Sequence, residues 1–127
     1  IMALFNVPVD QSDHARRGFE AARAILDYSR EATFGPGLRF ETNLGLHTGR
    51  IVAGNIGSSS RLEYSVLGDA VNTASRLEQL NKEFRTPMLL SGATVERLGD
   101  RSGLRLVAEE VAIRGRRGGL AVWTIAD

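Results

Sequence analysis

Apolar and polar positions follow the helical period in some stretches of the chain and the strand period in others. The first helical stretch has apolar residues three or four positions apart, namely Ala15, Phe19, Ala22 and Leu26. Residues at this spacing share one face of a helix, so we expect this face to be buried. Asp10, Asp13 and His14 carry metal-ligating groups, but the capping of this helix by Ser12 or Asp13 is the favoured interpretation, because a helix start needs such side chains.

Alternating stretches predict strands. One alternation consists of Phe40, Thr42, Leu44 and Leu46, and another consists of Leu62, Tyr64 and Val66. The second alternation places Ser65 on the opposite face of its strand, aimed away from the core. The run Ile1–Phe5 is apolar throughout and is expected to be a buried strand.

Gly and Pro residues divide the rest of the chain into short elements. In chain order we expect strands at Arg39–Leu46, Arg50–Gly54 and Arg61–Leu67, a helix that opens at Gly68–Asp69, a strand at Met88–Leu90, a helix at Ser91–Leu98, and strands at Leu104–Ile113 and Leu120–Ile125. The first two strands flank a tight turn at His47–Gly49, and the last two form a hairpin. This order predicts an α+β fold, with helices on one face of a mostly antiparallel sheet.

The composition limits the class of protein but indicates no further functional residue. The 127 residues suffice for a single domain, 1–127, with its own core. A net charge of +1 gives no indication of a nucleic-acid partner or a membrane surface. The chain has no cysteine, which excludes disulfides and is compatible with the cytoplasm. No apolar run approaches the roughly 18 residues of a membrane span, so we expect no membrane contact by this domain.

Asn72 and Arg76 are the first candidates for chemistry. They lie four residues apart in the helix predicted after Gly68, so they share one helical face. An amide and a permanent cation near the first turns of a helix suit an oxygen-rich anion. The alternative interpretation is that both residues solvate the outer face of an amphipathic helix, which is ordinary at this spacing.

Three motifs in order surround this helix: GLHTGR at 45–50, AGNIGS at 53–58 and YSVLGDAVNTASR at 64–76. Together they resemble the second half of a class III nucleotidyl cyclase catalytic domain, the adenylate and guanylate cyclase family. The resemblance implies a ferredoxin-like sandwich of that type, lacking the family's first strand, its first helices and the strand before residue 1.

The resemblance also implies a reaction at an interface between two catalytic domains. The ribose 3′ oxygen of ATP attacks the α-phosphorus and pyrophosphate leaves, while two divalent metals, Mg²⁺ or Mn²⁺, hold the triphosphate. By position, Asn72 orients the ribose, Arg76 stabilises the α-phosphate, and Ser65 reads the base, with its hydroxyl favouring adenine. Arg50 and Arg114 correspond to residues that reach the terminal phosphates, from different protomers. The implied partners are a second copy of the domain, in a homodimer, and ATP.

Two residues in these motifs are expected to be structural. His47 is expected to support its turn through a ring hydrogen bond, because a general base needs a partner that the sequence does not place. Asp69 is expected to be the N-cap of its helix. Arg50 also has a plain alternative as a surface residue of its strand.

The metal site implied by the family lies outside this sequence. Its two metal-binding aspartates and its base-selecting lysine are expected upstream of Ile1, so no metal ligand is expected in this chain. A non-catalytic cyclase-homology module that dimerises or regulates is therefore the alternative to an enzyme, although Asn72 and Arg76 favour the enzyme. The near-neutral charge and the lack of an aromatic-rich central strand disfavour a third reading, a ferredoxin-like nucleic-acid binder.

We therefore expect that residues 1–127 alone form no cyclic nucleotide, because no carboxylates are in place to hold two hard cations. The measurement is cyclic AMP and cyclic GMP formation with Mn²⁺, for this stretch and for the full-length protein side by side. Turnover by residues 1–127 alone would show that the metal site has been misplaced.

Overall fold

The computed structural model describes residues 1–32, 35–38, 41–58, 61–114 and 117–126, with only the backbone described for 55–58 and 61–67. Three helices are present in these ranges: α1 at His14–Glu31, α2 at Asp69–Phe84 and α3 at Gly92–Leu98. The strands are β1 at Leu44–Leu46, β2 at Val52–Ser58, β3 at Arg61–Leu67, β4 at Met88–Ser91, β5 at Leu104–Ala112 and β6 at Gly119–Ile125.

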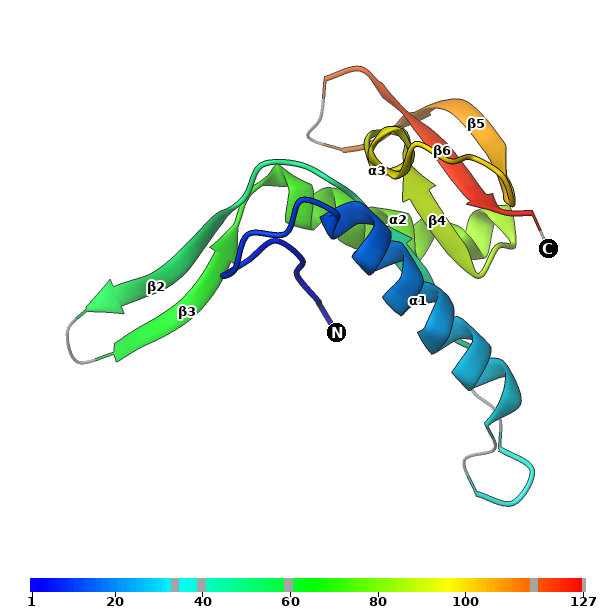
Figure 1. The fold of residues 1–127 in the computed structure, drawn as a ribbon, viewed down its shortest axis with the longest axis horizontal. Helices are drawn as coiled ribbons and strands as arrows, with labels where there is room; N and C mark the ends of the chain where they lie inside the picture. The colour runs from blue at the N-terminus through cyan, green and yellow to red at the C-terminus, as the bar shows by residue number, and fades with distance from the viewer. Residues whose placement is uncertain (33–34, 39–40, 59–60, 115–116, 127) are drawn as a thin grey trace.

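The strands form two separate sheets. A four-stranded sheet has the order β1-β4-β6-β5, in which β1 runs parallel to β4 and the other pairs are antiparallel. The antiparallel pair β2–β3 forms a second sheet, which projects away from the rest of the molecule as a two-stranded ribbon (Figure 1). The α+β class predicted from the sequence is confirmed.

Helices cover both faces of the four-stranded sheet, so the expectation that they lie on one face was wrong. On β4, Met88 and Leu90 pack with buried residues of α1 and α3, whereas Leu89 packs with Leu77 and Leu80 of α2. All four residues of β4 are buried, as expected of a strand with cover on both faces. A continuous apolar run such as MLL is the sequence signal for such cover, and the sequence interpretation did not use it.

The apolar face of α1 lies where the helical spacing predicted it. Ala15, Ala22 and Leu26 are buried, and Phe19 packs against the same core cluster. Asp13 occupies the N-cap position, but its carboxylate makes no cap hydrogen bond. Instead it accepts a hydrogen bond of 2.8 Å from Arg17 Nε, which lowers the pKa of Asp13.

The second half of the chain also follows its predicted elements. Strands β3, β4, β5 and β6 and helix α3 lie within a residue or so of the expected ranges, with Ser91 and Gly99 as the caps of α3. The N-cap of α2 is Gly68 and not Asp69, which is the first residue of the helix. Residues 115–116, in the connection of the expected hairpin, and residues 59–60, between β2 and β3 in the sequence, lie outside the described residues.

In the first half of the chain, the observed elements differ more from the predicted ones. Ile1–Phe5 forms no strand, and Ile1 and Met2 are exposed; a strand requires a neighbour for its backbone groups, and this segment is paired with none of the described strands. The strand expected from Arg39 begins only at Leu44, residues 39–40 lying outside the described ranges. The expected tight turn at His47–Gly49 is a longer connection, because β1 and β2 belong to different sheets.

Strand β1 packs directly on the backbone of α2. A Cβ atom at Gly45 would lie 2.5 Å from the Ala74 carbonyl oxygen and 2.5 Å from the Glu78 amide nitrogen. The buried Asn81 joins the same two elements, since its Nδ2 donates to the Leu44 carbonyl at 2.9 Å. The strand and the helix can approach this closely only because residue 45 has no side chain.

We expect Gly45→Ala to lower the free energy of unfolding by about 1–3 kcal/mol, because an added methyl has to displace the backbone of either β1 or α2. Denaturant unfolding measures this change. Gly54→Ala is the matched control, because a Cβ there meets no atom of the described residues within 4 Å. Equal stability of the two variants would contradict the packing described for β1.

Candidate functional site

Gly68, the N-cap of α2, directly follows the last residue of β3. Gly68 has φ of 142°, a conformation that residues with a side chain rarely adopt. A Cβ at Gly68 would also lie 3.0 Å from the Arg50 carbonyl oxygen. Gly68 therefore permits both the sharp entry into α2 and the close approach of the segment that carries Arg50.

Asn72 and Arg76 lie on the outer face of α2. Each successive residue of a helix is rotated by about 100°, so Arg76, two positions from both Ala74 and Glu78, faces away from the β1 contact. Both side chains are exposed, and Arg76 Nη1 makes only a long hydrogen bond of 3.5 Å, to Gln79 Oε1. The fold therefore leaves both polar groups available to a ligand or a partner.

The structure brings Arg50 to the start of the same helix. Besides the approach at Gly68, a Cβ at Gly49 would lie 2.9 Å from Ala70 Cβ, in the first turn of α2. The Arg50 side chain is exposed. Arg50 thus lies in the connection after β1, close to the turn that precedes Asn72.

The structure describes only the backbone of Ser65, and it gives Arg114 as an exposed residue. On β3, Ser65 pairs with Gly54 of β2, and its side chain lies outside what the structure describes. Arg114 is exposed just after β5 and follows Ile113, which is buried in the core cluster on the α2 side of the sheet. No hydrogen bond joins the described side chains of Arg50, Asn72, Arg76 and Arg114 to one another, and three of the four are arginines, which can only donate.

His47 makes the ring hydrogen bond that the sequence interpretation expected, but with a distant partner. Its Nδ1 lies 2.8 Å from the Ser91 hydroxyl, at the end of β4. The neighbouring Thr48 hydroxyl lies 2.9 Å from that of Thr94, in the first turn of α3. Sequence reasoning missed Ser91 and Thr94; the available signal was the S-x-x-T pattern of an N-cap directly after a strand.

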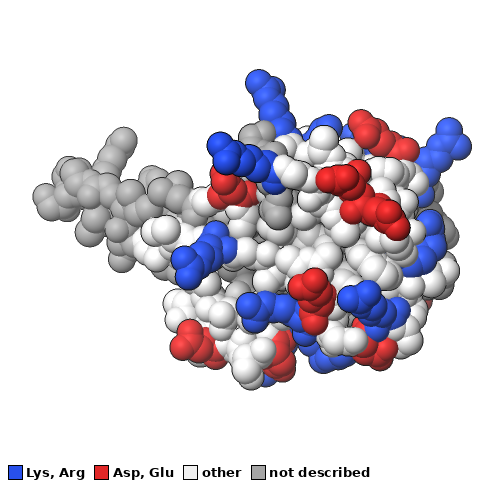
Figure 2. Space-filling model, turned by 90° about the horizontal axis from the view of Figure 1, so that it is seen from above, with Lys and Arg blue, Asp and Glu red and all other residues white. Residues whose placement is uncertain are grey.

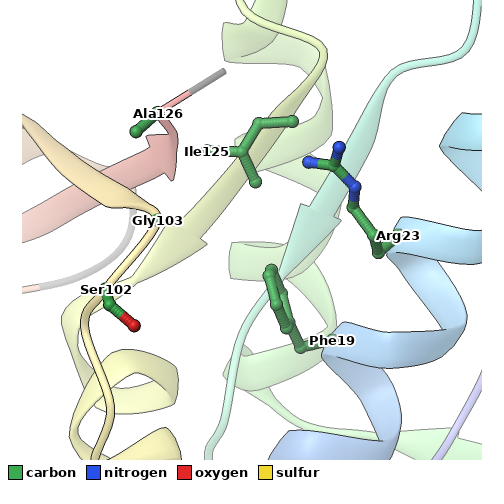
Figure 3. A pocket seen from close by; sticks show the side chains of 6 residues that line it. All are labelled: Phe19, Arg23, Ser102, Gly103, Ile125 and Ala126. Carbon is green, nitrogen blue, oxygen red and sulfur yellow. The ribbon is translucent and has the colours of Figure 1, made fainter.

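Two hollows in the described part of the chain lie away from these residues. The larger, of about 540 Å³, is shallow and open, and is lined by Phe19, Arg23, Ser102, Gly103, Ile125 and Ala126. Figure 3 shows Phe19 and Arg23 of α1 on one side of it and Ile125 and Ser102 on the other. The smaller hollow lies beside it, between α1 and the loop before β5. Neither hollow contains a residue predicted for the site.

The acidic and imidazole groups of the described residues indicate no metal centre. No group of three or more His, Cys, Asp or Glu in the described ranges is placed to hold a metal ion. Hydrogen bonds from Ser102 lower the pKa of Asp100, which lies in the loop after α3 and far along the chain from α2. Figure 2 shows acidic and basic side chains interspersed over the described part of one face.

Comparison with known proteins identifies the family. The family model of the adenylate and guanylate cyclase catalytic domain matches residues 1–127. The chain is 36% identical over 129 residues to adenylate cyclase 1 of Rhizobium meliloti, covering 98% of this chain and 19% of that protein. It is 35% identical over 135 residues to the terminal-differentiation specific adenylate cyclase of Dictyostelium discoideum, covering 100% of this chain and 6% of that protein.

A solved structure supports the fold. The guanylate cyclase domain of RhGC from Catenaria anguillulae, determined with GTP, superimposes with a TM-score of 0.79 at 23% identity, over 96% of this chain and 65% of that chain. The chain therefore belongs to the adenylate and guanylate cyclase catalytic domain family, as its three motifs predicted. It spans only a small part of the length of the curated relatives given above.

One further finding concerns membranes. Within the described ranges, none of the helices combines the length and the apolar character that a membrane span requires.

We expect Asn72→Ala and Arg76→Ala to change the free energy of unfolding by no more than about 0.5 kcal/mol, because both side chains are exposed and make no short contact. Leu77→Ala, on the buried face of the same helix, should cost about 2–5 kcal/mol. Thermal or denaturant unfolding compares the three variants. A large loss from either polar variant would assign that residue to the fold and not to a site.

Proposed function

We propose that the full-length protein is an adenylate cyclase, in which this domain converts ATP to 3′,5′-cyclic AMP and pyrophosphate as half of a homodimer. The observation that carries the proposal is the outer face of α2, where Asn72 and Arg76 are exposed one turn apart. Membership of the cyclase family supports the reaction class.

The reaction forms a bond between the ribose 3′ oxygen and the α-phosphorus, and breaks the bond between the α-phosphorus and the pyrophosphate oxygen. The 3′ hydroxyl loses its proton and pyrophosphate leaves with the electron pair of the broken bond. Catalysis of such a displacement rests on positioning and on the neutralisation of developing charge. The proposed residues supply both functions.

Asn72 offers both a donor and an acceptor at a fixed point of the helix, which suits it to orient the ribose. Arg76, one turn further, places a permanent cation and a planar fork of donors against the α-phosphate as charge accumulates there. Arg50, held near the start of α2, binds the terminal phosphates. Arg114 supplies a second cation to those phosphates, and Ser65 contacts the adenine base.

The exposure of the candidate residues supports the proposed dimer. Asn72 and Arg76 lie on an exposed helical face, and Arg50 and Arg114 are exposed as well. A nucleotide bound there by one chain alone would remain in water, where charge interactions are weak. A second cyclase domain packed over this face would enclose the nucleotide and complete the site.

The divalent metals of the family are not assigned to the described residues. Mg²⁺ and Mn²⁺ prefer several carboxylate or carbonyl oxygens, and the described part of the chain offers no acidic cluster. The residues present therefore do not fit the metals, and no step of the proposed mechanism is routed through them. Asn72, Arg76, Arg50 and Arg114 act on the nucleotide itself.

The decisive variant is Arg76→Ala in the full-length protein. We expect kcat to fall by about 100-fold or more, because the negative charge that Arg76 is proposed to neutralise at the α-phosphate develops mainly in the transition state. Cyclic AMP formation measures the loss, with cyclic GMP from GTP followed in parallel to test base preference. Sedimentation or size-exclusion measurements should show the dimer unchanged.

Lys82→Ala is the matched control, since it removes another exposed cation from the last turns of α2, away from Asn72 and Arg76. Full activity in Arg76→Ala would remove the proposed role. A full-length protein that dimerises but forms neither cyclic nucleotide would instead be the non-catalytic cyclase-homology module. A higher rate with GTP than with ATP would make it a guanylate cyclase.

A further inference from the structure

Four polar side chains connect the end of β1 to the start of α3. His47 Nδ1 lies 2.8 Å from Ser91 Oγ, and Thr48 Oγ1 lies 2.9 Å from Thr94 Oγ1. Within α3, the Ser91 and Thr94 hydroxyls lie 3.3 Å apart, and the Thr94 amide donates to Ser91 Oγ at 3.4 Å. This set, His47, Thr48, Ser91 and Thr94, is called the hydroxyl cluster below.

The two ends of the hydroxyl cluster differ in burial and in secondary structure. Ser91 and Thr94 are 0% and 2% exposed, and they belong to β4 and α3, which pack in the main core. His47 and Thr48 belong to the connection between β1 and β2, in which residues 47–51 pair with no strand. The hydroxyl cluster therefore fastens an irregular segment to a rigid part of the fold.

The fastened segment leads directly to Arg50. Beyond Thr48, the chain passes Gly49, which packs on Ala70 of α2, and then Arg50, whose carbonyl lies beside Gly68. A shift of Thr48 would move Arg50 relative to α2, because only one residue separates them. The backbone at Arg50 therefore lies between the hydrogen bond of Thr48 and the start of α2.

We propose that the hydroxyl cluster positions Arg50 for the nucleotide, and that Thr48 and Thr94 are its critical pair. The inference rests on the proposed function, since it takes the terminal phosphates as the ligand of Arg50. Thr48 and Thr94 do not touch the nucleotide; they act through Arg50. Their bond fixes the backbone from which the arginine reaches.

Valine is the sharpest substitution at both positions, because it keeps the shape of threonine and removes the hydroxyl. In the full-length protein, Thr48→Val and Thr94→Val should each weaken binding of a nonhydrolysable ATP analogue with Mn²⁺ by about five- to tenfold, the range expected for one lost hydrogen bond. The double variant should bind no more weakly than Thr94→Val alone, because Thr94→Val already removes the bond that Thr48→Val removes, together with the longer contacts of Thr94 to Ser91 and to the Leu46 carbonyl. Calorimetry or equilibrium dialysis measures these affinities.

Three controls separate positioning from general loss of stability. Thr94→Ser retains the hydroxyl and should bind the analogue as the wild type does. Thr124→Val removes another buried hydroxyl, which donates to the Met88 carbonyl at 2.6 Å, and should leave the affinity unchanged. In an Arg50→Ala background, Thr94→Val should cause no further loss, because the residue through which it acts is absent.

In turnover, the same valine variants should raise KM with kcat nearly unchanged, as for a lost ground-state contact. Unchanged affinity in Thr94→Val, an equal loss in Thr124→Val, or a further loss beyond Arg50→Ala would each overturn the positioning role. A wild-type protein that binds the analogue without turning over ATP would overturn the proposed function alone. A wild-type protein that does not bind the analogue would overturn both.

Discussion

The contact between Gly45 and the backbone of α2 is the constraint on which the candidate site depends. Because no side chain separates β1 from the helix at Ala74 and Glu78, the strand and the helix form one rigid unit. The buried Asn81 amide reinforces it through the Leu44 carbonyl. This contact fixes the rotation of α2, and the rotation decides which helical face points to solvent.

The exposed face of α2 is determined by the contact of Gly45 with the opposite face of the helix. Leu77 and Leu80 pack in the core, so Asn72 and Arg76 lie on the exposed side of the helix. The connection after β1 then brings Arg50 to the same end of the helix. Strand β1 therefore packs against α2, and the connection that follows it places Arg50 near Asn72 and Arg76.

Much of this arrangement was predictable from local sequence. The end of α3 at Gly99 and the apolar face of α1 follow from residue preferences that act within a few positions. The contacts of His47 and Thr48 did not follow, because their partners lie more than 40 positions away along the chain. The strand expected at Ile1–Phe5 failed for a similar reason: apolar residues make a strand only where a neighbouring strand is in register.

The sequence by itself determined the family, the order of most elements in the second half, and the shared helical face of Asn72 and Arg76. These properties depend on residue type and spacing, which are local. Only the tertiary structure decided that helices cover both faces of the sheet, that β1 pairs with β4 and not with β2, and that Arg50 lies at the start of α2. Each of these depends on which distant surfaces fit together, and no periodicity along one stretch contains that information.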